Sequence, residues 1–299
     1  MNTPAPIVLF VYNRPDHTEK TILSLQDNHP AKESDLFIFS DGAKGEKDKN
    51  KVAKVRTYIK SVTGFRNVII IERSGNMGLA NSIISGVTEI VNKYGNIIVL
   101  EDDLLPSPYF LTFMNDALKF YQNEEKVISI HGYIYPVTKK LPETFFLKGA
   151  DCWGWATWKR GWDLFNPDGT ALMKELKNKR LIKDFDFNNS YPYYKMLTNQ
   201  TKGENDSWAV RWYASAFLNN KLTLYPNRSL IFYNGNDGSG TNSNDSDEFK
   251  VDLSCRPVVL EKIEVTENKE ARKAFIHYFR YTRLTRKIMS RLKKLFHKK

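Results

Sequence analysis

The sequence predicts an α/β protein built around a mixed, mostly parallel β-sheet. Four short runs rich in β-branched and aromatic residues, 7–12, 36–40, 68–71 and 97–100, recur in the first third of the chain. The segments between them are long enough for the crossover helices that parallel strands require. Polar residues directly follow each run. Because parallel strands end at one edge of a sheet, ligand-binding groups are expected together at that edge.

Helices are expected between these strands. Asp16 and Glu19 have the spacing of a capping box and predict the start of a helix that runs to Leu25. Helical stretches over 51–62 and 79–94 follow the second and third strands. This alternation is typical of repeated β–α units whose helices cover both faces of a sheet.

After residue 105 the composition becomes aromatic and the pattern mixed. Helices are expected near 109–121 and over 208–217, with a strand over 127–131 between them. The length allows one large domain or two ordinary ones. The expected division is into a main domain, 1–265, whose halves are 1–105 and 106–265, and a tail, 266–299.

Positive charge is concentrated at the C-terminus. Residues 271–299 contain eleven Lys or Arg and no acid, whereas 1–270 contain 34 basic and 34 acidic residues. A nucleic-acid-binding protein more often spreads its positive charge over the folded surface, so nucleic acid is not expected as a partner. Residues 1–6 lack a basic leader region, and the apolar run after them is too short for a membrane span, so a cytoplasmic location is expected.

Three acids, Glu101, Asp102 and Asp103, directly follow the fourth apolar run. Adjacent carboxylates repel one another unless a cation lies among them, and hard oxygen ligands suit Mg²⁺ or Mn²⁺. The triplet therefore predicts binding of a metal-chelated anion at the sheet edge. The alternative is a solvated helix N-terminus, in which Asp102 or Asp103 caps a helix that begins near Pro106.

These residues carry a resemblance to a known family. The segment 7–15, the turn at Asp41, residues 76–79 and the acidic triplet resemble the N-terminal half of GT-A nucleotide-sugar glycosyltransferases of the large family 2 type. The triplet, followed by Trp153-Gly154-Trp155 and Asp206-Ser207-Trp208, is similar to the N-acetylglucosaminyltransferase I group. The resemblance covers residues 5–235. It implies a GT-A, Rossmann-like fold and a nucleoside-diphosphate sugar as donor, with a UDP-sugar as the first choice.

The resemblance also implies a donor site at the expected sheet edge. Asp103 matches the family's metal-binding acid, so it is expected to hold Mn²⁺ or Mg²⁺ at the diphosphate, with Glu101 and Asp102 on the ribose or on waters of the metal. Asp41 is expected to bind the edge of the base. Further donor contacts are expected from Asn13, Arg14, Asn76 and Gly78. The alternative for the residues outside the acidic triplet is an ordinary turn or loop.

Sugar transfer with inversion needs a carboxylate that removes the proton of the acceptor hydroxyl. Asp206 matches the acid that precedes a Trp in the similar family, and we expect it to be this catalytic base. Here the sequence reads Asp-Ser-Trp where family members often have two adjacent acids, which leaves Glu204 as a substitute. The alternative is that Asp206 caps the helix over 208–217.

The tryptophan motif offers flat apolar faces for a sugar ring. Trp153 and Trp155, with Gly154 between them, are expected to contact the acceptor or the transferred sugar, because indole faces pack on the C–H face of a pyranose and indole N–H groups bond to hydroxyls. The alternative is that both rings belong to the hydrophobic core. For His131, at the expected end of a strand, a core position is favoured over contact with donor or metal.

The tail predicts a basic amphipathic helix. From residue 274 onward apolar residues recur mostly at three- or four-residue steps, and Lys or Arg fill much of the remainder. Such a helix suits the surface of an anionic membrane, where it would bring the protein close to a lipid-linked acceptor. The alternative is a terminal helix that docks on the protein or joins two copies.

Together these observations predict an inverting, metal-dependent hexosyl- or N-acetylhexosaminyltransferase. It would build a surface polysaccharide, on a glycan or lipid-linked glycan acceptor, as a peripheral protein at the inner face of the membrane. Two alternatives remain open. One is a membrane-attached scaffold on a degenerate GT-A fold. The other is a sugar-nucleotidyltransferase, which is disfavoured because no Gly-rich, basic nucleotide-binding signature follows the first strand.

Overall fold

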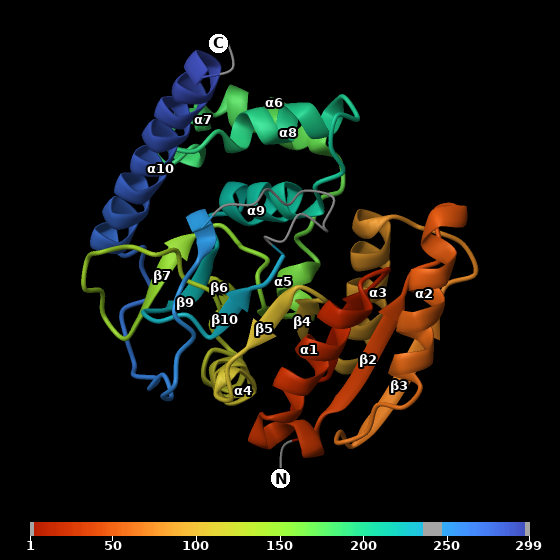
Figure 1. Cartoon of the computed structure of the whole chain (residues 1–299). Coiled ribbons are helices and arrows are strands. Elements are labelled where there is room, and N and C mark those ends of the chain that lie inside the picture. The colour runs from red at the N-terminus through yellow and green to blue at the C-terminus, as the bar shows by residue number, and fades with distance from the viewer. Residues whose placement is uncertain (1–2, 236–246, 297–299) are drawn as a thin grey trace.

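The structure is a computed structural model that describes residues 3–235 and 247–296. Within the last helix, side chains are described as far as Thr285. Figure 1 shows a central sheet with helices packed on both faces. The prediction of an α/β fold with a mixed, mostly parallel sheet is therefore confirmed.

Eight strands form the main sheet, and two short strands form a separate ribbon. The main sheet has the order β3-β2-β1-β4-β8-β6-β9-β7. Strands β1 to β4, β6 and β9 run in one direction, whereas β8 and β7 run in the other. The strands are β1 Ile7–Val11, β2 Asp35–Ser40, β3 Asn67–Glu72, β4 Asn96–Glu101, β5 Leu104–Pro106, β6 Val127–His131, β7 Thr144–Lys148, β8 Trp155–Trp158, β9 Leu222–Pro226 and β10 Ile231–Tyr233.

Alternate side chains of β1 enter two different cores. Ile7 and Leu9 pack with α1, α2 and α4, whereas Val8 and Phe10 pack with α3 and α9 on the opposite face. The helices are α1 Pro15–Gln26, α2 Glu46–Ile59, α3 Leu79–Tyr94, α4 Phe110–Phe120, α5 Lys159–Trp162, α6 Gly169–Asn178, α7 Ile182–Phe185, α8 Tyr193–Thr201, α9 Trp208–Leu218 and α10 Lys269–Phe296, with short 3-10 turns η1 His29–Glu33 and η2 Asp247–Phe249. Burial on both faces explains the continuous apolar runs of the central strands.

Two sequence-based boundaries need correction. Helix α1 begins at Pro15, so Arg14 is the N-cap and the expected capping box at Asp16 does not form. The acidic triplet is followed by strand β5, and α4 begins only at Phe110. Asp102 and Asp103 are therefore not helix caps, which removes the alternative explanation of the triplet.

Helix α10 is docked on the protein for half of its length. Phe275 and Phe279 lie in a second core with side chains of α6 to α9, and Arg272 forms ion pairs with Asp184 and Glu267. Figure 1 shows the helix along one flank of the molecule. The tail helix therefore packs on the main domain, and the division at 265/266 remains a prediction. In the described parts of the chain, no helix combines the length and apolarity needed to cross a membrane.

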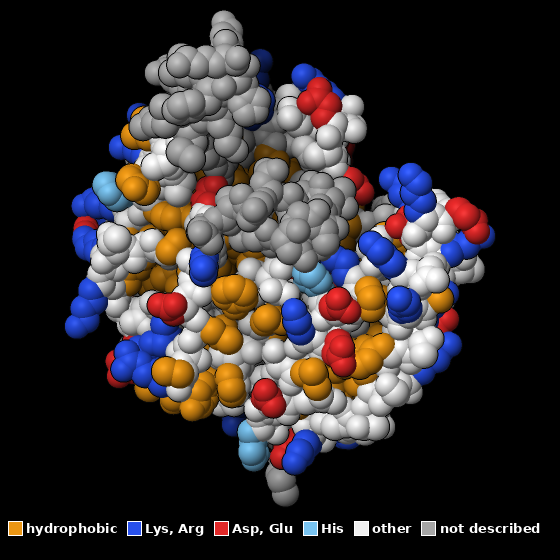
Figure 2. Space-filling view, in the orientation of Figure 1, with side chains coloured by type: hydrophobic (Ala, Val, Ile, Leu, Met, Phe, Trp, Pro, Cys, Tyr) orange, Lys and Arg blue, Asp and Glu red, His pale blue; other side chains and the backbone are white. Residues whose placement is uncertain are grey.

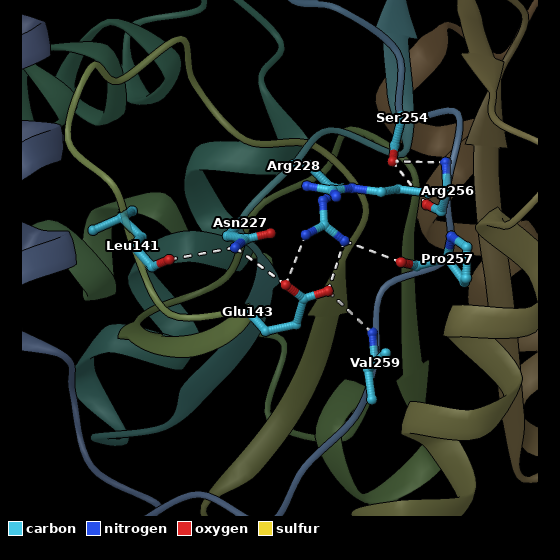
Figure 3. Close-up of polar contacts among 8 residues, drawn as sticks. All are labelled: Leu141, Glu143, Asn227, Arg228, Ser254, Arg256, Pro257 and Val259. Atoms are coloured by element: carbon cyan, nitrogen blue, oxygen red, sulfur yellow. Dashed lines mark hydrogen bonds and ion pairs between the residues drawn. The ribbon is translucent and has the colours of Figure 1, made fainter.

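A bidentate ion pair attaches the segment before α10 to the sheet. Both guanidinium Nη atoms of Arg228 donate to the Glu143 carboxylate, at 2.6 and 2.7 Å (Figure 3). The backbone N–H of Val259 donates to Glu143 Oε1 at 3.2 Å, and Arg228 Nη1 also donates to the carbonyl of Pro257 at 3.0 Å. This brace connects the residues after β9 with the chain that leads to α10.

Candidate functional site

Six strands place their C-terminal ends at one edge of the main sheet, and antiparallel β8 starts there. Arg14 follows β1, and the acids Glu101, Asp102 and Asp103 lie at the end of β4. Arg14 Nη2 donates to the carboxylate of Asp102, and to Asp103 Oδ2 at 3.0 Å. The cation among the acids is therefore the protein's own guanidinium. Burial lowers the pKa of Arg14, but the two carboxylates raise this pKa by more than burial lowers it. Arg14 therefore stays charged.

The three acids have different environments. Asp102 is buried, and its Oδ2 accepts the backbone N–H of Tyr12 at 3.4 Å. Burial raises the pKa of Asp102, Arg14 lowers it, and the charge of Asp103 raises it again, to about 6 in all. Burial, followed by the charges of Asp103 and Asp102, raises the pKa of Glu101 to about 8. This raised pKa favours the protonated form of Glu101, which can donate a hydrogen bond.

Asp103 is the acid best placed to bind a metal. Its side chain is 15% exposed, against 5% for Asp102. Its Oδ2 is held by Arg14, and no hydrogen bond from the described residues reaches Oδ1. In residues 3–235 and 247–296 no group of three or more His, Cys, Asp or Glu could enclose a metal. One free carboxylate oxygen still fits Mg²⁺ or Mn²⁺, because these ions commonly take their remaining ligands from phosphate and water.

Asp41 acts as a clamp between two loops. Its carboxylate accepts the backbone N–H groups of Met77 at 2.8 Å, Gly78 at 3.0 Å and Gly42 at 2.9 Å, and the amide of Asn76 at 3.1 Å. Asn76 also donates to the Gly42 carbonyl at 2.8 Å. These four bonds saturate the buried carboxylate, so Asp41 and Asn76 position the start of α3 rather than present free polar groups.

Asn13 lies beside these residues but is directed to helix α2. Its Nδ2 donates to Asp48 Oδ1 at 2.9 Å. In this arrangement its amide is engaged with the protein, as the turn alternative expects, and donor contact by Asn13 remains a prediction.

Asp206 lies close to the start of α3. A β-carbon placed on Gly78 would be 3.9 Å from Asp206 Oδ2, and the φ of Gly78 is +78°, which favours glycine. The N-cap of α9 is Ser207, whose hydroxyl accepts the N–H of Val210 at 3.2 Å. Asp206 therefore does not cap the helix. Its side chain is 65% exposed, with Arg211 Nη2 at 3.7 Å as its ion-pair partner.

The substitute base, Glu204, is exposed and its backbone N–H donates to the carbonyl of Asn199, at the end of α8. Asp206, not Glu204, is the acid whose carboxylate lies at the Gly78 turn.

The tryptophan motif is mainly structural, which corrects the expectation for Trp155. Trp155 is 1% exposed and packs against Trp162, Trp208 and Trp212, so it cannot offer a face to a sugar. A β-carbon at position 154 would lie only 2.5 Å from the side chain of Ile231, so close packing explains why this residue is a glycine.

Trp153 remains partly exposed at the sheet edge. It stacks on Tyr233 with ring centroids 4.6 Å apart. Its backbone N–H donates to His131 Nε2 at 3.0 Å. Burial lowers the pKa of His131, so this histidine is a neutral core residue, as favoured from the sequence.

Two partners of the site were not singled out from the sequence. The backbone N–H of Asn234 donates to the Asp103 carbonyl at 2.8 Å, and its carbonyl lies 3.2 Å from His17 Nε2. Asp151, between β7 and β8, lies beside Cys152 near the acids. In the sequence, Asp151 could have been noticed because it directly precedes the Cys-Trp-Gly-Trp motif. The contact of Asn234 is made by its backbone and leaves no side-chain signal.

No protein-family model and no curated protein matches this chain. Among solved structures it is similar to a mannosyltransferase, PcManGT from Pyrobaculum calidifontis in complex with GDP-Man and Mn²⁺, with 9% identity over 73% of this chain and 69% of that one and a TM-score of 0.39. It is also similar to TarS of S. aureus, with 12% identity over 77% of this chain and 37% of TarS and a TM-score of 0.40. These values indicate a distant likeness from which no activity is transferred.

Proposed function

We propose that the protein is a metal-dependent, inverting glycosyltransferase that uses a nucleoside-diphosphate sugar. One observation carries this proposal. The sheet edge that holds the acids and Arg14 also holds the Gly78 turn, and the exposed carboxylate of Asp206 lies against that turn. An anion-binding group, a hard oxygen ligand and a solvent-accessible carboxylate are the three protein groups that transfer from a sugar diphosphate requires.

Each group has a separate task in this proposal. Asp206 accepts the proton of the acceptor hydroxyl while that oxygen bonds to the anomeric carbon and the bond to the diphosphate breaks. Asp103 holds the cation, and Arg14 adds positive charge where the diphosphate departs. When bound, Mn²⁺ or Mg²⁺ neutralises the charge that develops on the leaving diphosphate. Protonated Glu101 donates to a ribose hydroxyl.

The finer assignments belong to the proposal as well. A UDP-sugar is the first choice of donor, and the acceptor is a surface glycan, free or lipid-linked. Asp41 and Asn76 support the donor through the Gly78 turn, whose backbone they hold. A nucleotidyltransferase is not favoured, because the exposed carboxylate at the Gly78 turn is explained by proton removal from an acceptor.

We also propose that the protein attaches peripherally to the cytoplasmic face of an anionic membrane. The part of α10 that would contact the membrane is smaller than the sequence suggests. Phe275, Ile276 and Phe279 are buried in the second core and cannot enter a membrane. Among the described side chains of α10, Tyr281 and Leu284 are 62% and 59% exposed, next to the basic residues of the helix. On the coloured part of the face in view, Figure 2 shows Lys and Arg side chains interspersed with Asp and Glu.

Calorimetric titration tests the proposal. UDP-glucose, UDP-N-acetylglucosamine and GDP-mannose are each added to the protein with and without Mn²⁺. We expect at least one of them to bind only when Mn²⁺ is present. A non-catalytic scaffold would be supported if none of the sugars bound under either condition.

A further inference from the structure

Asp151 lies at the active edge of the sheet, between β7 and β8. Strand β8 is antiparallel to β4, so its first residue, Trp155, pairs with Val99 near the end of β4, two residues before Glu101. The next residue, Cys152, indicates that Asp151 lies near the acids that follow β4. The pKa of the Cys152 thiol is raised by burial and, in order, by the charges of Asp151, Glu101 and Asp103. The charges of Asp151, Glu101 and Asp103 thus all act on the same thiol.

The carboxylate of Asp151 has few partners. Its Oδ1 accepts the backbone N–H of Cys152 at 2.9 Å, and its Oδ2 accepts the hydroxyl of Tyr225 at 3.4 Å. His131 Nε2 lies 3.9 Å away, but this nitrogen accepts the N–H of Trp153 and has no proton to donate. In the part of the chain that the structure describes, no Lys or Arg forms an ion pair with Asp151.

Tyrosines lie near this carboxylate, and one of them, Tyr225, donates a hydrogen bond to it. Burial raises the pKa of Tyr133, Tyr135, Tyr193 and Tyr225, and the nearby charge of Asp151 raises each of them further. Tyr135 and Tyr193 are only partly buried, and the Asp151 side chain is 21% exposed. The carboxylate thus contacts a backbone N–H, a tyrosine hydroxyl and the ring of His131, and it is partly accessible from solvent.

Such a carboxylate has unused capacity to accept hydrogen bonds. A carboxylate has about four lone-pair positions, of which Asp151 uses one firmly and one weakly. Partial burial without a cation or a full set of donors is costly, and a ligand that brings donors removes that cost. Neighbouring hydroxyls of a pyranose ring are such donors, and its C–H face packs on aromatic rings.

We propose that Asp151, to which Tyr225 donates a hydrogen bond, forms a subsite for a pyranose ring and accepts hydrogen bonds from two hydroxyl groups of that ring. This inference rests on the proposed function, since it concerns the sugar that this edge would handle. The ring belongs either to the donor or to the acceptor. Asp151 would then determine sugar specificity without contacting the nucleotide.

Asp151→Asn tests the subsite, because it keeps the size of the side chain and removes the charge. Asp163→Asn is the matched control, since Asp163 is half exposed and pairs with Lys159 on a helix next to β8. Thermal melting shows first that both variants fold. Calorimetry with Mn²⁺ then compares UDP with UDP-glucose and UDP-N-acetylglucosamine, and GDP with GDP-mannose. Saturation-transfer NMR measures free glucose, galactose, mannose and N-acetylglucosamine in the presence of UDP and Mn²⁺.

We expect Asp151→Asn to bind UDP and GDP as the wild type does. If the ring belongs to the donor, the variant should bind the nucleotide sugar at least about tenfold more weakly, the effect of losing one charge-assisted hydrogen bond. If it belongs to the acceptor, the donor affinities should be retained and the free-sugar signal lost. Asp163→Asn should change none of these.

Two results would overturn the inference. One is equal binding of every nucleotide sugar and free sugar by wild type and Asp151→Asn. The other is an equal loss for nucleotide and nucleotide sugar, which indicates a general structural role. If Asp151→Asn does not fold, Asp151→Glu replaces it and should alter the preference among the sugars. Free-sugar binding that depends on Asp151, in a protein that binds no nucleotide, would support the subsite and reject the proposed transferase.

Discussion

At the scale of single residues, the structure gives Asp206 an exposed carboxylate that does not cap a helix. Ser207 takes the capping role at α9, which leaves Asp206 exposed beside Gly78. Asp206→Asn should therefore leave donor affinity nearly unchanged while turnover falls by about 10²- to 10⁴-fold, the usual contribution of a general base. Steady-state kinetics with calorimetry on the same variant separates the two effects.

Glu204→Gln is the matched control for this variant, because Glu204 lies two residues away and is also exposed. It should retain turnover. The base would move to Glu204 if the two variants gave the reverse result. A product whose anomeric configuration matched that of the donor would contradict direct inversion.

At the scale of elements, Asp41 holds the 75–78 loop and the start of α3 in place. Asp41→Asn keeps a carbonyl oxygen but loses the charge that the backbone N–H groups of Met77 and Gly78 bond to. We expect the free energy of unfolding to fall by about 1–3 kcal/mol and donor affinity to fall with it. Chemical denaturation and calorimetry measure the two quantities. If Asp41 read the base directly, the variant would change the preference between UDP and GDP sugars while its stability stayed the same.

Helix α10 is docked on the protein through Phe275 and Phe279. Its side chains are described as far as Thr285. Truncation after Thr285 removes seven of the eleven basic residues of 271–299 and leaves the buried Phe275 and Phe279 in place. Because each basic group near an anionic surface contributes about 1 kcal/mol, the truncated protein should leave anionic vesicles at low salt. Vesicle sedimentation measures this, and unchanged thermal stability is the control. Undiminished sedimentation of the truncated protein would rule out residues 286–299 as the anchor.

At the scale of the whole molecule, the Glu143–Arg228 brace should give a measurable pH dependence of stability. Burial raises the pKa of Glu143, but the bonds from Arg228 and the Val259 N–H lower it more, so the folded pKa lies below the ordinary value of 4.5. The brace then stabilises the fold fully above about pH 4.5, and this contribution disappears as the pH falls through the depressed folded value.

Glu143→Gln should accordingly lower the free energy of unfolding by about 1 kcal/mol at pH 7. This is the upper end of the range for surface ion pairs, because this pair is only partly exposed and has bidentate geometry and an added backbone bond. The difference from wild type should shrink as the pH falls below 4. Urea unfolding at a series of pH values measures it. A cost that stayed constant from pH 7 to pH 3 would show that the charge of Glu143 does not contribute.

Much of the fold could be predicted because local signals agreed. Helix α3 was expected over 79–94, and glycines with positive φ at 78 and 95 mark both its ends. Contacts between distant residues could not be predicted. Arg14 reaches acids 88 and 89 positions away, and Asp41 is saturated by a loop 35 to 37 positions away. Trp155 and Phe275 show a further limit of prediction from sequence. An apolar ring can contact a sugar, enter a membrane or pack in a core, and the residue type is the same in all three cases.

The central claim is that Asp103 holds a divalent cation to which a sugar diphosphate binds. The most direct measurement is calorimetric titration of wild type and Asp103→Ala with the nucleotide sugar that the wild type binds, with and without Mn²⁺. Loss of a charge-assisted ligand should weaken Mn²⁺-dependent binding by at least about tenfold, while binding without metal is the same in both proteins. Equal Mn²⁺-dependent affinity in a folded Asp103→Ala protein would contradict the account.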